Sequence, residues 1–174
     1  MTRLSAGIGT VRLNHLNPPF NNVKMRQAVL MVADQRDYLS AMAGDPKNWR
    51  TCFSFYACDG TETDEQGGEA LSGPRDYDKA KRLIGESGYK GERVVVLDAA
   101  DIPQPHAEAL VTNDLLKRLG LNVELATTEW GTVIKRLLMR RRGGSSGTRK
   151  LGPSRRWIGG FGRGVASAAR RPRP

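Results

Sequence analysis

The sequence predicts an α/β fold with parallel or mixed strands. Helical and strand patterns alternate between residues 76 and 139, in the order helix, strand, helix, strand, helix. One of the strand patterns is a short β-branched run, which is typical of a buried strand. A chain of 174 residues is also long enough for one domain with a hydrophobic core.

The first expected element is a strand within TVRLNHLNPPF, residues 10–20. Val11 and Leu13 alternate there with polar residues, which is the period of a half-buried strand. Pro18 and Pro19 end the pattern, because proline has no N–H to give to a strand ladder.

Two helices are expected next. Asn21 or Asn22 can cap a helix through VKMRQAVLMVA, residues 23–33, and Asp34 can cap a shorter one, QRDYLSAMA. Gly44 and Pro46 end the second helix. The helical spacing predicts a buried face of the first helix made of Val23, Gln27, Leu30 and Met31.

Residues 45–75 show no regular pattern and begin with an aromatic-rich stretch. A loop of this length is often functional, but it can equally cover a neighbouring core. The chain's two cysteines, Cys52 and Cys58, lie in it. A bridge between them suits an oxidising compartment and two reduced thiols suit the cytosol; two cysteines are too few for a zinc site.

The clearest helix lies in RDYDKAKRLIGESGYKG, residues 75–91. We expect Asp78 to cap it and Gly88 to end it, with a buried stripe of Ala80, Leu83 and Ile84. A buried strand, ERVVVLDA, follows.

The next helix lies in HAEALVTNDLLKRLG, with Leu110, Leu115 and Leu119 expected to face inward and Gly120 at its end. A second strand, LNVELAT, and a last helix, EWGTVIKRLLM, complete the pattern.

Charge divides the chain into an acidic body and a basic tail. The net charge is +10, but the 13 Lys and Arg residues after Trp130 are accompanied by no Asp or Glu. Residues 1–130 therefore carry 15 basic and 18 acidic side chains.

No apolar run approaches the roughly 20 residues that span a bilayer, and the N-terminal residues do not have the pattern of a signal peptide.

Three stretches, in order and correctly spaced, carry a resemblance to a known family. They are LNHLNPPFNNVKMRQAVLMVADQRDYL, YDKAKRLIGESGYKG and LLKRLGLNVELATTEWGTVIKR. The first has an Asn, then Pro-Phe, Arg-Gln-Ala and Asp-Arg; the second is a Tyr-Asp helix that ends in Gly-Tyr; the third is a Leu-Gly strand followed by a Trp helix. These stretches resemble the family 5 extracytoplasmic solute-binding proteins, which serve ABC-type peptide importers.

The resemblance implies a two-lobed, periplasmic-binding-protein-like fold that closes about a hinge. Residues 8–136 are expected to form part of the second lobe, with the first lobe missing before residue 1. Residues 137–174 are expected to form a disordered Arg/Gly-rich tail. Because this tail lacks acidic residues, we hypothesise that the reading frame slips between about Val133 and Arg142.

The family implies binding of a peptide or similar solute and delivery to an ABC permease in the membrane. It places the protein in the periplasm, whereas this chain without a signal would stay in the cytoplasm. By approximate position, the expected ligand-binding residues are Trp49, Phe53, Tyr56 and Gln104. Packing is the stronger expectation for Phe53. Peptide binders can hold the ligand carboxylate with an Arg near the turn after the VVVLD strand, but this chain has DIPQPH there.

The sequence raises two other functions. The tail could bind nucleic acid non-specifically through its cations, although the body offers no basic excess. Catalysis is not expected, because the only histidines are His15 and His106 and no HExxH or GxSxG motif occurs. His106 lies at a helix start, where a cap or surface role is ordinary. No cofactor and no metal are expected.

Overall fold

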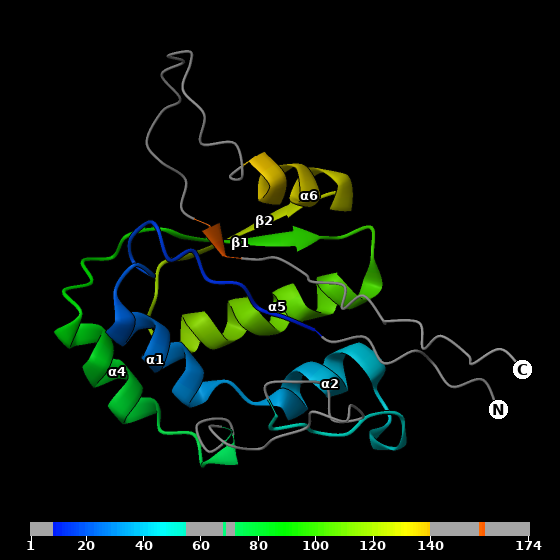
Figure 1. Cartoon of the computed structure of the whole chain (residues 1–174), viewed down its shortest axis with the longest axis horizontal. Coiled ribbons are helices and arrows are strands. Elements are labelled where there is room, and N and C mark those ends of the chain that lie inside the picture. Colours follow the sequence, from blue (N-terminus) through cyan, green and yellow to red (C-terminus); the bar gives the residue numbers. More distant parts are fainter. Residues whose placement is uncertain (1–8, 55–67, 69–71, 140–156, 159–174) are drawn as a thin grey trace, which may run out of the picture.

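The protein folds around a three-stranded parallel sheet with strand order β2-β1-β3 (Figure 1). The structure, a computed structural model, describes residues 9–54, 68, 72–139 and 157–158. Strand β1 is Val94–Ala99, β2 is Val123–Thr128 and β3 is Trp157–Ile158. Val94 pairs with Val123 and Val95 with Trp157. The predicted α/β fold with parallel strands is confirmed.

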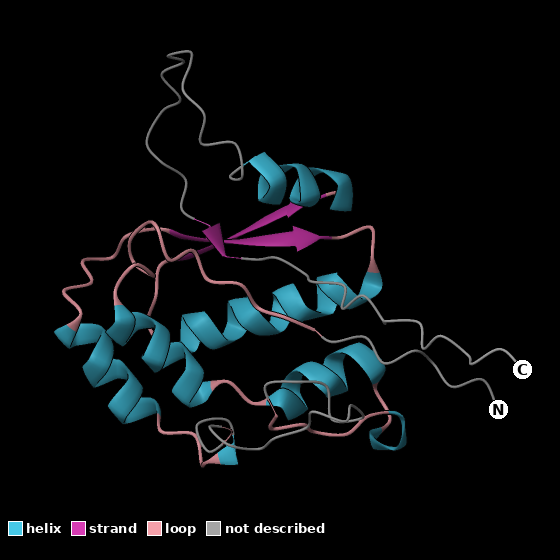
Figure 2. Ribbon diagram, in the orientation of Figure 1, coloured by secondary structure: helices cyan, strands magenta, loops and turns pink. Residues whose placement is uncertain are grey.

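Helices cover both faces of the sheet (Figure 2). On one face lie α1 (Val23–Val32), α2 (Gln35–Ala43), α4 (Tyr77–Glu86) and α5 (Pro103–Arg118), and a short 3-10 turn, η1 (Pro46–Asn48), follows α2. Helix α6 (Trp130–Met139) lies on the opposite face. All six residues of β1 are therefore buried, which explains why Asp98 is the one polar residue in this strand.

Successive residues of β1 serve two separate cores. Val94 and Val96 pack with α1, α4 and α5 in the larger cluster. Val95, Leu97 and Ala99 pack with Val133 of α6 in the smaller one. This alternation is the two-residue period of a strand, so β1 joins the two helical layers.

Local capping fixes where the helices begin. Asn22 accepts a hydrogen bond from the Lys24 N–H at 2.9 Å and Asp34 accepts one from the Arg36 N–H at 2.8 Å, as predicted. The prediction for α4 was wrong by two residues. Asp76, not Asp78, is the cap, because its Oδ1 accepts from the Lys79 N–H at 2.8 Å.

The buried faces of two helices also differ from prediction. On α1 the buried residues are Met25, Ala28, Val29 and Val32, whereas Val23 is 53% and Leu30 42% exposed. This helix is apolar on more than one side, so spacing alone does not select its inner face. On α5, Leu115 and Leu119 are buried as predicted, but Leu110 is 43% exposed. The polar residues Glu108 and Thr112 occupy the inner face instead.

The segment predicted as an N-terminal strand forms none of the strands in the described part of the chain. Asn14, inside it, is buried and accepts a hydrogen bond from the Leu16 N–H, which is a local turn contact rather than a ladder contact. Leu13 forms only an isolated β-bridge, because alternation over four residues is too short a signal for a full strand.

The predicted boundary between body and tail stays a prediction. Helix α6 continues to Met139, and the two residues of β3 lie within the tail range, where they pair with β1. Residues 140–156 and 159–174 lie outside the described residues. No helix among the described residues is long and apolar enough to cross a membrane.

Replacement of a core leucine on α5 tests the inner face of this helix. We expect Leu116→Ala to lower the free energy of unfolding by about 2–5 kcal/mol, because the fully buried side chain leaves a cavity. Leu110→Ala on the same helix is the matched control and should change it by less than about 1 kcal/mol. Urea unfolding followed by circular dichroism measures both, and equal losses would contradict this packing.

Candidate functional site

The order of the strands makes the carboxyl end of β1 the candidate region for ligand binding. The chain leaves β1 through α5 to reach β2 on one side, and α6 precedes β3 on the other side and the opposite face (Figure 1). Ligands of open α/β sheets bind outside the carboxyl ends of strands at such a change of direction. Residues 98–106 surround this end of β1 and form the candidate site, called here the β1 edge.

A buried carboxylate organises the β1 edge. Asp98 is 1% exposed, and its Oδ1 lies 2.7 Å from Nδ1 of His106 in the first turns of α5. Its Oδ2 accepts a hydrogen bond from the Thr127 hydroxyl of β2 at 3.0 Å. Both oxygens are therefore satisfied, as burial of a charged group requires. Because Nδ1 of His106 is engaged, the side chain, 39% exposed, has Nε2 left for other partners.

The loop after β1 is tied to the opposite helical layer. Asp101 Oδ1 accepts a hydrogen bond from the Trp130 N–H at 2.7 Å, so Asp101 caps α6 from a distance of 29 residues in sequence. Gln104 is exposed in the first turn of α5, and Glu129 is exposed just before α6. The β1 edge thus offers a histidine, an amide and carboxylates to solvent.

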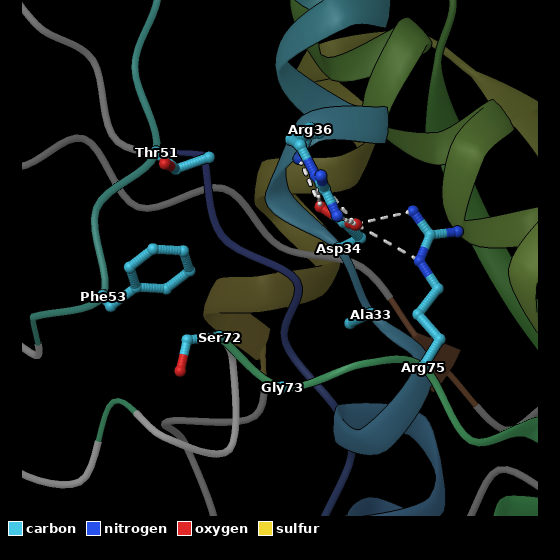
Figure 3. A pocket seen from close by; sticks show the side chains of 8 residues that line it. All are labelled: Ala33, Asp34, Arg36, Thr51, Phe53, Ser72, Gly73 and Arg75. Carbon is cyan, nitrogen blue, oxygen red and sulfur yellow. Dashed lines mark hydrogen bonds and ion pairs between the residues drawn. The ribbon is translucent and has the colours of Figure 1, made fainter.

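A hollow with a volume of about 180 Å³ lies beside the start of α2 (Figure 3). Phe53 and Thr51 line one side, and Arg75 and Asp34 line the other. Ligand pockets usually measure roughly 300–1,000 Å³. This hollow is therefore too small to enclose a peptide.

Ion pairs dominate the walls of this hollow. Asp34 Oδ2 lies 2.7 Å from Arg36 Nη2 and 2.9 Å from Arg75 Nη2, and Arg75 Nη1 lies 2.8 Å from Asp37 Oδ2. The hydrogen bonds from Arg36, and then those from Arg75, hold the pKa of Asp34 well below its usual range. The cluster fastens the start of α2 to the segment before α4, which is a structural role.

A buried carboxyl group with one unpartnered oxygen lies on α5, two positions after His106. Glu108 is 4% exposed, and its Oε2 makes no hydrogen bond. A Cβ atom on Gly9 would lie 2.0 Å from Glu108 Oε1, so Gly9 is needed where the N-terminal segment crosses this helix. Burial raises the pKa of Glu108 to about 7.

The structure places the predicted ligand-binding residues in different settings. Trp49 follows η1 and donates its indole N–H to the Gly44 carbonyl at 3.2 Å. Phe53 lines the hollow beside α2, and Gln104 lies on the β1 edge. Tyr56 lies outside the described residues. Their roles in binding stay predictions.

Sequence reasoning missed the pairing of Asp98 with His106. It treated His106 as an ordinary residue near a helix start and gave Asp98 no role. The available signal was an aspartate at the end of an apolar strand, followed eight positions later by a histidine in the first turns of the next helix. The tertiary turn between β1 and α5 brings them together.

Comparisons with known proteins identify relatives of this chain. Residues 2–145 match the profile of the bacterial extracellular solute-binding proteins, family 5 middle region. The probable peptide ABC transporter periplasmic-binding protein y4tO of Sinorhizobium fredii is 35% identical over 73% of this chain and 24% of its own length. The dipeptide-binding protein DppE of Bacillus subtilis is 30% identical over 75% of this chain and 25% of its own length.

The fold is shared with solved structures. The binding protein MoaA of A. tumefaciens R10, in complex with mannopinic acid, matches with a TM-score of 0.63 and 20% identity over 77% of this chain and 26% of its own. The chain thus spans about a quarter of the length of its curated relatives. The expected partial periplasmic-binding-protein-like lobe is confirmed.

Glu108 predicts an unusual dependence of stability on pH. Its pKa is higher in the folded chain than the ordinary 4.5, so the folded state favours the protonated form. The resulting stability is present at low pH and is lost as the pH rises from about 4.5 to about 7. Glu108→Gln should match the native chain at pH 4 and exceed its free energy of unfolding by roughly 3 kcal/mol at pH 8.

Urea unfolding at both pH values measures this difference. Asp114→Asn is the control on the same helix, because Asp114 is exposed and paired with Arg118. It should show no gain at pH 8. A Glu108→Gln variant with an equal effect at both pH values would contradict the burial of an unpaired carboxyl group.

Proposed function

Because this chain belongs to the family 5 bacterial extracellular solute-binding proteins, we propose that it forms part of the substrate-binding component of an ABC-type importer for peptides or similar small solutes. The observation that carries the proposal is the family match, which spans residues 2–145. The names of two curated relatives, a peptide and a dipeptide binder, support peptides as the solute class.

The β1 edge supports binding as the activity of this lobe. It exposes His106, Gln104 and carboxylates at the position where α/β sheets receive ligands. These groups donate and accept hydrogen bonds, which is sufficient to hold a peptide backbone or a polar solute. We propose that the chain binds its solute without catalysing a reaction. Among the described residues, no group of three or more metal-ligating side chains is present.

Trp49, Phe53, Tyr56 and Gln104 remain the proposed ligand-contacting residues. Gln104 has direct support from its exposed place on the β1 edge. Phe53 has a different setting, since it lines a hollow walled by ion pairs. A lobe that supplies part of a binding site requires the rest of the site from outside these residues, and we propose that the first lobe of the family fold supplies it.

The proposed location is outside the cytoplasm, with an ABC permease as the membrane partner. The family description and the periplasmic relative support this location. Cys52 is disulfide-bonded, which is typical of oxidising compartments, while Cys58 lies outside the described residues.

Binding of nucleic acid by the tail has no support from the comparisons.

Solute binding is tested by amide NMR of the ¹⁵N-labelled chain. We expect trialanine to shift the amide resonances of the non-proline residues among 98–106 and to be recovered intact, whereas glucose should shift them less. Gln104→Ala should weaken binding by about two- to tenfold, because one hydrogen-bonding side chain is lost. Trp49→Ala, Phe53→Ala and Tyr56→Ala test the other predicted contacts in the same titration.

Lys47→Ala serves as the control, since Lys47 is exposed in η1 and has no assigned role. It should bind trialanine as the native chain does. If trialanine leaves the β1 edge unshifted at saturating concentration, or is hydrolysed, the proposed function is wrong.

A further inference from the structure

We propose that Glu108 is a proton-operated latch for the N-terminal segment, residues 9–14: its neutral carboxyl group holds the segment against α5, and the carboxylate releases it. This inference goes beyond solute binding and does not depend on which solute the β1 edge receives. It starts from the burial of Glu108 and from the close crossing of the chain at Gly9.

The N-terminal segment lies directly on the carboxyl group of Glu108. A Cβ atom at Gly9 would lie 2.0 Å from Glu108 Oε1 and 3.0 Å from its Cδ, so the crossing leaves no space for a methyl group. Glu108 is 4% exposed, and its Oε2 has no hydrogen-bond partner among the described residues. A neutral carboxyl group tolerates this setting far better than a carboxylate, because burial without partners penalises charge.

The elements around Glu108 differ in how firmly they are held. The Tyr38 hydroxyl of α2 lies 3.2 Å from the Thr112 hydroxyl, which itself donates to the Glu108 carbonyl at 2.8 Å. These contacts join α2 to α5. Residues 9–12, in contrast, are exposed, and Asn14 is the buried residue of the segment. Because exposed segments open at a lower free-energy cost than packed helices, the N-terminal segment is the element that moves when a charge on Glu108 requires water.

Other titratable groups near this crossing do not take over the role of Glu108. Burial, and to a smaller degree the negative charge of Glu108, raise the pKa of Tyr38, so its phenol stays neutral between pH 5 and pH 8. In the N-terminal segment, Arg12 is exposed and stays charged throughout this range. Ion pairs or hydrogen bonds engage acidic groups on the elements packed against α5, namely Asp37 with Arg75, Asp98 with His106, and Glu124 with Arg93.

The pH at which the latch opens follows from the burial of its carboxyl group. Burial raises the pKa of Glu108 to about 7 in the closed arrangement, whereas a released carboxyl group titrates near its ordinary 4.5. The stabilisation of the closed arrangement is therefore fully present below about pH 4.5 and is lost as the pH rises to about 7. Because this segment carries the chain into the body, its release frees the direction in which the chain enters.

The latch is tested by ¹⁵N relaxation of the full chain at pH 5 and pH 7.5. We expect the backbone order parameters of residues 10–13 to fall from about 0.85 at pH 5 to below about 0.6 at pH 7.5. Residues 25–32 of α1 should stay at about 0.85 at both pH values, because release is local.

Two variants on α5 separate the latch from a general effect of pH. Glu108→Gln has nearly the shape of the neutral acid and carries no charge, so residues 10–13 should stay rigid at both pH values. Asp114→Asn is the matched control, because Asp114 is exposed on the same helix and paired with Arg118. This control should lose order at pH 7.5 as the native chain does.

The inference is wrong if residues 10–13 of the native chain have the same order parameters at both pH values, or if their loss of order persists in Glu108→Gln. It is also wrong if α1 loses order together with the segment, since the change is then not local. Should Glu108→Gln fail to fold, the comparison of the segment with α1 in the native chain decides the matter. The trialanine titration is a separate measurement, so the solute-binding proposal and the latch can fail independently.

Discussion

The structure depends on the burial of β1 between two helical layers. Its residues alternate between a core shared with α1, α4 and α5 and a core shared with α6. Each layer covers only one face of the strand, so neither layer alone would remove β1 from water. The same burial reaches Asp98 near the end of the strand, and a carboxylate is tolerated there only because two side chains satisfy its oxygens.

Hydrogen bonding to the carboxylate oxygens decides how two buried carboxyl groups behave, one at the end of β1 and one on α5. Asp98 has a histidine and a hydroxyl as partners and organises its surroundings. Glu108 has an unpaired Oε2, and its burial raises its pKa to about 7. One group contributes a fixed geometry, whereas the other makes the stability of the helix packing depend on its protonation.

The sequence predicted the features that short-range chemistry decides. Asn22 and Asp34 cap their helices because capping needs only a side chain and nearby N–H groups. The β-branched run of β1 and the parallel arrangement were also predictable, since burial on both faces requires continuous apolar residues. Within the candidate site, Gln104 lies in the first turn of α5, which follows β1, and its role in binding stays a prediction. The Asp98–His106 contact was missed, because it depends on how β1 and α5 pack.

Helix faces were less predictable for a related reason. On α1, apolar residues lie on several sides, and packing against α4 selected the face that includes Met25 and Val32. On α5, Glu108 and Thr112 take inner positions that a hydrophobic pattern assigns to leucines. Polar residues gain such positions through tertiary contacts, as the Tyr38–Thr112 hydroxyl contact at 3.2 Å illustrates.

The shared fold does not determine what this family member binds. Relatives named for peptides and dipeptides, and a solved structure that holds mannopinic acid, resemble the same body of this chain. Their common sheet is a scaffold, and we propose that specificity in this chain resides in the exposed side chains at its carboxyl edge. In this chain those side chains include Gln104 and His106, and they are held in place by a strand whose own residues never reach solvent. Under this proposal, changes at the β1 edge alter the solute that is recognised while the buried strand and its two cores remain the same.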